Sequence, residues 1–248
     1  MSGHSKWSTI KRKKAAVDAK RGKIFTKLIK EISVAARAGG GDPDANPRLR
    51  TAMDNARAQN LPTETMEKAI QRGTGELPGV VYEPVTYEAY GPGGVAIFIE
   101  ALTDNKNRTV ASVRHLLTRH GGNLGSDGVV AWMFDQQGQI LVDAGRYDED
   151  AVLLAAAEAG AEDVVTEEGV HRVMTPFTRF QAVLDALQAA GIATLEAELA
   201  MVPRTTVPVE GPTAVKLLRL LEALDDDEDV QKVAANFDMD ESLLAEAS

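Results

Sequence analysis

The chain contains no cysteine among its 248 residues. Disulfides, thiolate metal ligands and a cysteine nucleophile are therefore excluded, and a reducing compartment fits this composition. Long apolar runs are missing as well: none approaches the roughly 20 residues that a membrane-spanning helix needs, and the N-terminus lacks the apolar centre of a secretory signal. We expect a cytoplasmic protein without a membrane partner.

Recognisable catalytic and metal-binding patterns are also absent. The glycine-rich stretch 91–94 lacks the lysine and the serine or threonine of a nucleotide-binding loop, and it lies in a predicted hairpin. His115 and His120 are five positions apart, so they do not share a helical face as a metal-binding pair four apart would. No spacing singles out a pair of carboxylates. We expect no enzymatic activity, no cofactor and no metal ion.

Charge is distributed unevenly along a chain whose net charge is −10. Residues 1–37 hold eleven Lys and Arg against two Asp and Glu, a net charge of +9. Residues 73–248 hold eleven basic and thirty acidic groups, a net charge of −19, and the stretch between is neutral. This asymmetry favours a polyanion bound at one end while the acidic body repels it elsewhere. The alternative is a solvated basic tail on a soluble acidic body.

The basic residues continue into an amphipathic segment. Between Arg21 and Ala38 apolar residues recur at steps of three and four, and three glycines follow, which predicts a helix. A stripe of lysines lies on the face opposite the apolar one. We predict that the basic run and this stripe contact a nucleic-acid phosphate backbone. The candidate contact residues are Lys6, Trp7, Lys11, Arg12, Lys13, Lys14, Lys20, Arg21, Lys23, Lys27 and Lys30.

Trp7 lies within the basic run and has two interpretations. Its ring stacks on a base beside the phosphate contacts, or it docks the N-terminal arm onto the body as a hydrophobic anchor. The sequence favours neither.

A second basic face is predicted on a later helix. Residues 103–105 offer N-terminal caps for a helix that runs to His120, with its apolar residues inward. Arg108, His115 and Arg119 then lie together on the outer face. Such a face suits docking into a ribonucleoprotein.

The remaining pattern predicts an α+β protein of several domains. Two short helices, one opened at Asn46 and one from Thr63 closed by Gly73, complete a three-helix head. A hairpin over 80–102 and a strand near 129–134 follow. Residues 138–203 then show the order strand, helix, strand, strand, helix, strand that is typical of a ferredoxin-like unit.

After this unit come a helix, an acidic run at 225–229 that we expect to form a solvated turn, and a strand near 230–237. Because this late strand lacks a partner nearby in sequence, we infer that the ferredoxin-like unit is inserted into a middle domain. The predicted domains are a basic helical domain with an N-terminal arm, an α/β middle domain in two pieces, and the inserted ferredoxin-like domain. They span residues 1–78, 79–134 with 204–248, and 135–203.

Long, ordered motifs run through the whole chain. They are Gly3-His4-Ser5-Lys6-Trp7, Ile10-Lys11-Arg12-Lys13-Lys14, Asp18, Arg21-Gly22-Lys23, Phe25-Thr26-Lys27, Asn60-Leu61-Pro62, Ala69-Ile70-Gln71-Arg72-Gly73, Asp104-Asn105-Lys106-Asn107-Arg108-Thr109, Gly121-Gly122-Asn123-Leu124-Gly125 and Asn236-Phe237-Asp238. Together they resemble the YebC/PmpR family of regulatory proteins, to which the mitochondrial translational activator of cytochrome oxidase is related.

This resemblance implies a three-domain, cleft-shaped protein with a helical N-terminal domain and a ferredoxin-like domain inserted in the second domain. Bacterial members of the family are generally described as cytoplasmic DNA-binding transcriptional regulators. The mitochondrial relative is a translational activator, and bacterial relatives have been linked to relief of ribosome stalling. One departure is the stretch VQKVAA at 230–235, where the family pattern implies a strand that contains tyrosine.

We therefore expect a non-enzymatic nucleic-acid-binding regulator of gene expression, whose partner is DNA or ribosomal RNA, the latter within the ribosome. The sequence shows no recognisable helix with base-reading residues, so structured RNA read by shape and phosphate is at least as compatible as an operator. The alternative is a protein-interaction adaptor whose ferredoxin-like domain binds a ligand or partner. That alternative predicts binding that does not respond to salt.

Overall fold

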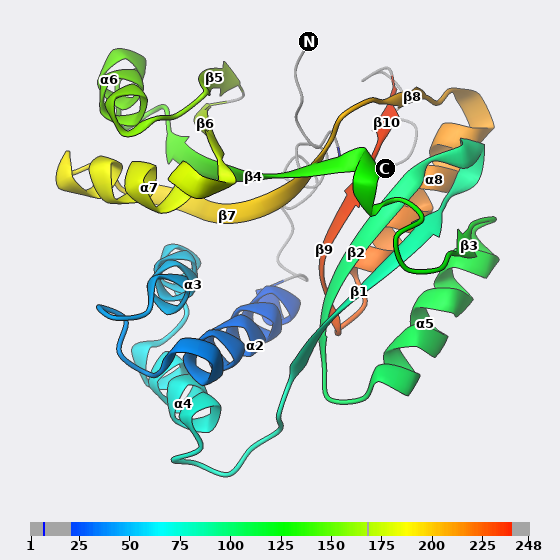
Figure 1. Cartoon of the computed structure of the whole chain (residues 1–248), viewed down its shortest axis with the longest axis horizontal. Helices are drawn as coiled ribbons and strands as arrows, with labels where there is room; N and C mark the ends of the chain where they lie inside the picture. The colour runs from blue at the N-terminus through cyan, green and yellow to red at the C-terminus, as the bar shows by residue number, and fades with distance from the viewer. Residues whose placement is uncertain (1–6, 8–20, 168, 240–248) are drawn as a thin grey trace. The chain divides into compact units, whose positions relative to one another are not determined.

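The computed structural model describes Trp7 and residues 21–167 and 169–239 (Figure 1). These residues form helices and separate β-sheets, which confirms the predicted α+β class with a helical N-terminal region. The chain divides into two compact units. Unit 1 holds the described residues up to Lys27, Val80–Asp135 and the described residues from Met201 onward, and unit 2 holds Leu28–Gly79 and Gln136–Ala200.

Three helices occupy the N-terminal region. They are α2 (Arg21–Gly39), α3 (Pro47–Ala58) and α4 (Thr63–Thr74). Asn46 begins α3, because its side chain accepts a hydrogen bond from the backbone N–H of Leu49 at 3.1 Å. The same side chain donates to the carbonyl of Ala35 at 2.8 Å, which ties the start of α3 to α2.

Gly73 lies inside α4, although the sequence predicted that it closes the helix. The helix ends at Thr74, and Gly75 caps it with a left-handed φ of 85°. A Cβ atom at position 73 would lie 2.3 Å from the backbone oxygen of Ser33 in α2. The hydroxyl of Ser33 donates in turn to the carbonyl of Ala69 in α4. Glycine is needed at position 73 because α2 and α4 approach each other closely there.

Unit 1 is built on a four-stranded antiparallel sheet. Its strands, in the order β3-β1-β2-β9, are β3 (Asn123–Leu124), β1 (Glu83–Tyr90), β2 (Ala96–Thr103) and β9 (Val230–Ala235). The β1–β2 hairpin closes through a turn in which Gly93 and Gly94 adopt φ of 78° and 75°, values that favour glycine. Strand β9 pairs with β2 although residues 135–203 lie between them in the chain.

Helices α5 (Lys106–Arg119) and α8 (Gly211–Asp225) pack side by side on one face of this sheet. Ile97 and Ile99 of β2 join the core beneath them, whereas Phe98, which points to the opposite face, packs with Phe134 and Val130. This alternation follows from the two-residue repeat of a strand. A short parallel pair, β8 (Val207–Pro208) with β10 (Phe237–Asp238), completes the unit.

The segment before Phe134 is not the strand that the sequence predicted. A single 3-10 turn spans Ala131–Met133 instead. The carboxylate of Glu88, which is 7% exposed, accepts hydrogen bonds from the backbone N–H groups of Gly128, Val130 and Ala131 at 2.6, 2.6 and 2.8 Å. These N–H groups are therefore satisfied by a side chain rather than by a neighbouring strand.

A second sheet has the strand order β5-β6-β4-β7. Its elements, in chain order, are β4 (Phe134–Asp143), α6 (Glu149–Ala159), β5 (Asp163–Glu167), β6 (Val170–Pro176), α7 (Phe180–Ala189) and β7 (Thr194–Pro203). This is the predicted βαββαβ order. Val142, Val173 and Leu187 belong to the core between its sheet and helices. The predicted domain boundaries at residues 78, 134 and 203 stay predictions.

Within the described part of the chain, no helix combines the length and apolar character that crossing a bilayer requires.

Candidate nucleic-acid interface

Much of the predicted interface lies outside the described residues. This applies to Lys6, Lys11, Arg12, Lys13, Lys14 and Lys20, while Arg21 is described only as the first residue of α2. The part that the structure does describe consists of Trp7 and the α2 lysines Lys23, Lys27 and Lys30.

The indole of Trp7 is buried in unit 1. It is 3% exposed and belongs to the same core cluster as Leu217 and Phe237. No described residue accepts a hydrogen bond from its Nε1 atom. In this position the ring packs as a hydrophobic anchor, and a base could stack on it only after it left the core. Its predicted contact with nucleic acid stays a prediction.

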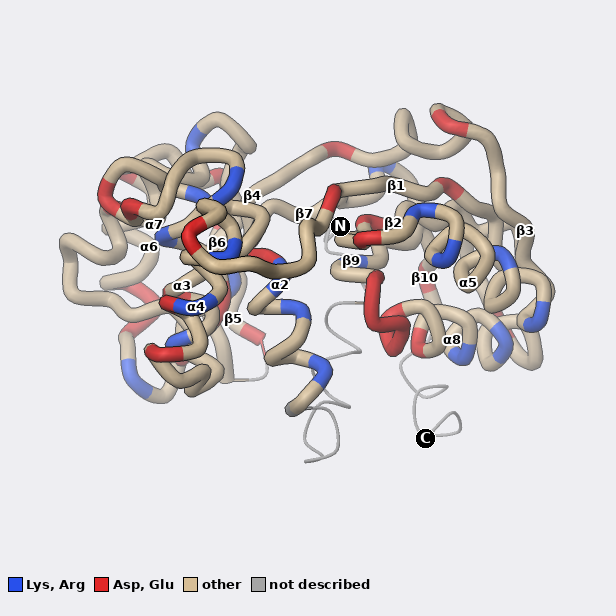
Figure 2. The backbone as a smooth tube through the Cα atoms, turned by 90° about the horizontal axis from the view of Figure 1, so that it is seen from below, with Lys and Arg blue, Asp and Glu red and all other residues tan. Residues whose placement is uncertain are grey.

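Lys23 and Lys27 lie against the segment Asp225–Asp229, which we call the acidic turn (Figure 2). The ammonium group of Lys27 donates to the backbone carbonyl of Asp225 at 2.7 Å and lies 3.4 Å from its carboxylate. Lys23 Nζ lies 3.4 Å from a carboxylate oxygen of Asp226. The lysine face of α2 therefore already meets anionic oxygens, and these belong to the protein itself.

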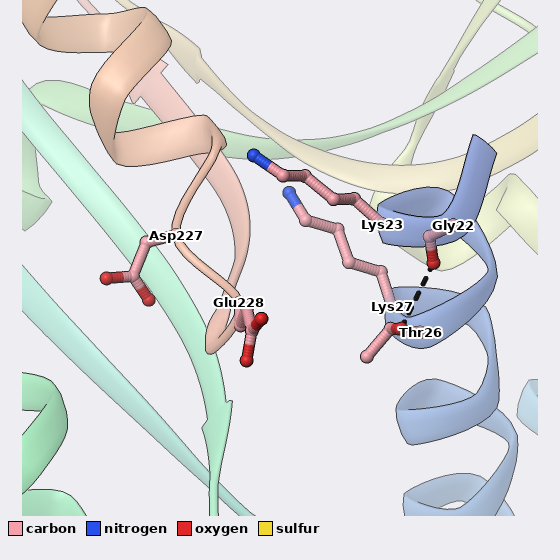
Figure 3. A pocket seen from close by; sticks show the side chains of 6 residues that line it. All are labelled: Gly22, Lys23, Thr26, Lys27, Asp227 and Glu228. Carbon is pink, nitrogen blue, oxygen red and sulfur yellow. Dashed lines mark hydrogen bonds between the residues drawn. The ribbon is translucent and has the colours of Figure 1, made fainter. Parts of the chain in front are cut away.

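A pocket of about 370 Å³ opens at this contact (Figure 3). Its lining is basic on one side and acidic on the other, and the lining residues are Gly22, Lys23, Thr26, Lys27, Asp227 and Glu228. The side chains of Lys23 and Lys27 extend toward the acidic turn, as Figure 3 shows. The Lys23–Asp226 pair is about half exposed, whereas both side chains of the Lys27–Asp225 pair are largely buried. Solvent therefore weakens the first ion pair more than the second.

Lys30 does not lie on the exposed face that the helical pattern predicted. It is 5% exposed, and it interacts with neighbouring groups. The residues that follow it on α2, Ile32–Ala36, are buried as well. Lys30 is not accessible to a ligand in this arrangement.

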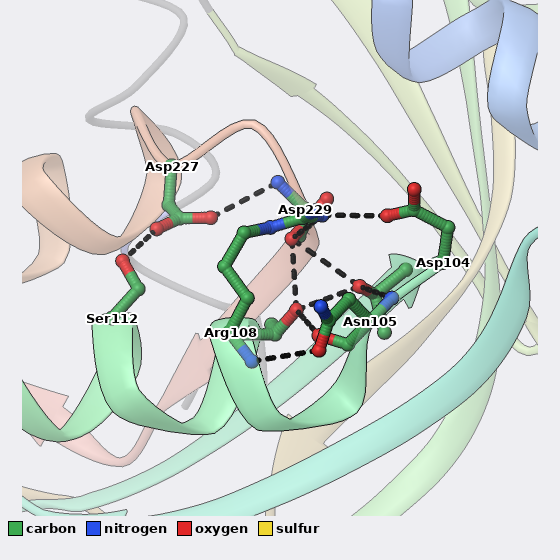
Figure 4. A network of polar contacts seen from close by, with 8 residues as sticks. Asp104, Asn105, Arg108, Ser112, Asp227 and Asp229 are labelled. Carbon is green, nitrogen blue, oxygen red and sulfur yellow. Dashed lines mark hydrogen bonds and ion pairs between the residues drawn. The ribbon is translucent and has the colours of Figure 1, made fainter.

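The acidic turn is held in place by α5 rather than solvated throughout, as the sequence had suggested. Asp229 is 6% exposed, and its carboxylate accepts hydrogen bonds from Thr109 Oγ1 at 2.8 Å and from Arg108 Nη2 at 2.8 Å (Figure 4). Ser112 donates to Asp227 at 2.5 Å. The buried Asp229 carboxylate is stabilised because Thr109 and Arg108 both donate to it.

Arg108 completes this network from the start of α5. Its Nη2 atom also donates to Asp104 at 2.7 Å, and its backbone N–H is capped by Asn105 at 3.1 Å. The hydrogen bonds from Arg108 to Asp229 and Asp104, together with their negative charges, raise the pKa of the guanidinium further above its already high value. The motif DNKNRT thus positions the acidic turn opposite the α2 lysines.

The three residues of the predicted second basic face differ in their surroundings. Arg108 is committed to two carboxylates, so its charge is largely compensated. His115 and Arg119 are exposed and form no ion pair with any described residue. The sequence pattern did not indicate two exposed cations on α8, Lys216 and Arg219, a helix that packs against α5. A helical projection of α8 predicts that both side chains face solvent. Only the packing of α8 against α5 shows that the helix that carries them adjoins α5.

No group of three or more histidine, aspartate or glutamate side chains is arranged to hold a metal ion within the part of the chain that the structure describes. The carboxylates of Asp225, Asp226, Asp227 and Asp229 are paired with arginine, lysine or hydroxyl donors. The arrangement is suited to exchanging one set of anionic oxygens for another at a lysine surface.

Comparison with known proteins agrees with this architecture. Residues 5–76 match the family model of the TACO1/YebC protein N-terminal domain, and residues 82–237 match that of the TACO1/YebC second and third domain. A probable transcriptional regulatory protein of Magnetococcus marinus is 57% identical over 245 residues, and one of Desulfotalea psychrophila is 56% identical over 245 residues. Both alignments cover 98% of this chain and 98% of the relative.

Among solved structures, the crystal structure of a conserved hypothetical protein from Aquifex aeolicus is similar over 92% of this chain and 94% of that chain. The sequence identity is 47% and the TM-score is 0.85. The family that the sequence motifs suggested is therefore confirmed. The chain belongs to the TACO1/YebC family.

Proposed function

We propose that this protein is a non-enzymatic regulator of gene expression that binds the phosphate backbone of nucleic acid through its basic N-terminal segment and the first turns of α2. The observation that carries the proposal is the lysine face of α2. Lys23 and Lys27 project from one side of the helix and already bind oxygen anions and a carbonyl of the acidic turn. Phosphate oxygens present the same chemistry to an ammonium group.

The charge distribution supports the same proposal. The first 37 residues carry a net charge of +9, in a chain whose net charge is −10. Phosphate contacts from such a segment release counterions and drive binding, while the acidic body limits contact elsewhere. Relatives that align with almost the entire chain are named probable transcriptional regulatory proteins, which fits a regulator. A cytoplasmic location is part of the proposal.

The proposal includes two kinds of nucleic-acid target, DNA and RNA. The names of the relatives favour DNA. One feature supports RNA: both cationic regions described above consist of lysine, arginine and histidine side chains, without a recognisable base-reading helix. Shape and phosphate recognition of structured RNA, including ribosomal RNA in the ribosome, requires no such helix.

Ultraviolet crosslinking in living cells, followed by purification of the protein and sequencing of the attached nucleic acid, tests the proposal. The test variant has alanine at Lys11, Arg12, Lys13 and Lys14. A control variant with alanine at Arg37, Lys68, Arg114 and Arg179 removes the same charge from scattered positions. If crosslinked ribosomal RNA is lost only in the test variant, the protein is a translation factor. If crosslinked promoter DNA is lost only in the test variant, it is a transcriptional regulator.

Equilibrium binding in solution provides the second measurement. If about six phosphates are contacted, the affinity for duplex DNA falls roughly 10³-fold between 50 and 200 mM salt. The test variant should show a shallower dependence than the control. No enrichment of either nucleic acid, or binding that salt leaves unchanged, would contradict the proposal and support the adaptor alternative.

A further inference from the structure

Helix α5 is unusual in this acidic chain because it contains no acidic residue. Its sequence KNRTVASVRHLLTR carries four Lys and Arg and one histidine. Lys106 pairs with Glu83 at 2.8 Å, and Arg108 pairs with Asp104 and Asp229. The other cations, Arg114 and Arg119, form no ion pair with a described residue, and neither does the exposed His115. The charge toward the C-terminal end of α5 is therefore uncompensated by the described part of the protein.

Helix α8 adds two cations beside this end. Lys216 and Arg219 are exposed, lie one turn apart on α8, and form no ion pair with a described residue. Val113 and Leu117 of α5 and the inward leucines of α8 share one core on the same face of the sheet. The two helices lie side by side (Figure 2), so exposed residues of both contribute to one surface of unit 1.

His120 lies within the electrostatic influence of one arginine on α5 and one on α8. His120 caps the C-terminus of α5 and is partly buried. Burial lowers the pKa of its imidazole, and the positive charges of Arg119 on α5 and Arg219 on α8 lower it further. Both guanidinium groups therefore act on the same imidazole from two different helices. An anion bound near both groups would be attracted by each of them and would offset their mutual repulsion.

We propose that His115, Arg119, Lys216 and Arg219 form a second phosphate-binding surface, the α5–α8 surface, which contacts the backbone of the nucleic acid bound by the N-terminal segment. This inference rests on the proposed function. It differs from the face predicted from sequence, because Arg108 is committed to carboxylates and the cations of α8 replace it. Exposed cations on two adjoining helices, with no ion-pair partner among the described residues, match the spaced phosphates of a nucleic-acid backbone better than a single small anion.

The test compares three forms of the full-length protein on fluorescently labelled duplex RNA and duplex DNA, with affinity measured by anisotropy across a salt series. The surface variant carries Arg119→Gln, Lys216→Gln and Arg219→Gln. The control variant carries Arg37→Gln, Arg114→Gln and Arg179→Gln, which removes the same charge from exposed positions elsewhere. Arg114 lies about 140° around α5 from Arg119, so it does not face α8.

The surface variant should bind at least about tenfold more weakly than the control at the same salt concentration. The slope of log affinity against log salt should become shallower by about one unit for each phosphate that the variant no longer binds. Thermal unfolding should show that the variant is folded, since removal of adjacent like charges does not disturb the core. The probe with the larger difference, RNA or DNA, identifies the backbone that the surface binds.

Two outcomes would count against the inference, and they are distinguishable. If the wild type binds and a Lys23→Gln, Lys27→Gln variant binds weakly, but the surface variant equals the control, then the α5–α8 surface is not a phosphate site and the proposed function stands. If the wild type binds neither probe, both the inference and the proposed function are overturned.

Discussion

Lys27 and Asp225 are 198 residues apart in the chain, yet the Lys27 ammonium donates to the Asp225 carbonyl at 2.7 Å and lies 3.4 Å from its carboxylate. The pair joins the most basic region of the sequence to its most acidic run. Because Asp229 is bonded to α5, the acidic turn holds this position as part of unit 1. Nucleic acid that binds Lys23 and Lys27 must therefore displace carboxylates from them.

This competition predicts that a weaker acidic turn strengthens binding. Asp225→Asn with Asp226→Asn should raise the affinity for nucleic acid, by up to about fivefold from loss of the exposed Lys23–Asp226 pair alone, because an exposed ion pair contributes roughly 0.2–1 kcal/mol. Affinity is measured by anisotropy at low salt. The control Asp127→Asn with Glu158→Gln changes the net charge equally at exposed positions elsewhere. An equal gain in affinity in both variants would show that the net charge, and not the contact with Lys23 and Lys27, causes the effect.

The bond between Thr109 and Asp229 should contribute measurably to stability. Thr109→Val leaves the buried carboxylate without one donor, and we expect the free energy of unfolding to fall by about 1–3 kcal/mol. Thr118→Val makes the same change at an exposed position of the same helix and should alter stability by less than about 0.5 kcal/mol. Urea denaturation of both variants is the measurement. Equal losses would mean that the effect comes from the helix rather than from Asp229.

Glu88 should make stability depend on pH. Burial raises the pKa of its carboxyl, but the three backbone N–H donors outweigh this and lower the pKa below its ordinary value of 4.5. A depressed pKa stabilises the folded state above the unfolded pKa, and this stabilisation is lost as the pH falls through the folded value. Glu88→Gln should therefore be destabilised at pH 7, and its difference from wild type should shrink below pH 4.5. Unfolding free energies between pH 7 and 3 test this. A difference that is constant across the range would contradict it.

Gly73 and Gly22 should respond oppositely to alanine. Gly73→Ala places a Cβ atom against the Ser33 carbonyl, and a loss of about 1–3 kcal/mol is expected from the forced separation of α2 and α4. At Gly22 a Cβ atom meets no described atom within 4 Å, so alanine should be neutral or stabilise α2 by up to about 1 kcal/mol. Thermal unfolding of the two variants separates these effects, and a stable Gly73→Ala protein would show that the helices can separate without cost.

Trp7 should behave as an anchor in solution. Trp132 is 63% exposed and is the other tryptophan of the chain, so Trp132→Phe leaves Trp7 as the single reporter. Its fluorescence should be blue-shifted and poorly quenched by acrylamide, because the ring is buried. Saturating nucleic acid should leave the emission unchanged. Strong quenching on binding would instead show that the ring leaves the core to stack on bases.

Local patterns in the sequence determined most of the secondary structure. The apolar repeat and the asparagine caps located α2, α5 and the start of α3 to within a residue or two, since these signals act over one or two helical turns. The pattern failed at residues 129–133, where β-branched residues predict a strand. Three N–H groups there bind the distant carboxylate of Glu88, a contact that no local signal contains.

By itself, the sequence determined the charge asymmetry, the absence of thiol chemistry, the α+β class and the family. These properties depend on composition and on motifs that are contiguous in the chain. Tertiary structure decided which charges are free. It buried Lys30, paired Lys27 with Asp225 and Arg108 with Asp229, and packed α8 against α5. The reason is physical: the availability of a charge depends on neighbours in space, and those neighbours come from segments that only the fold brings together.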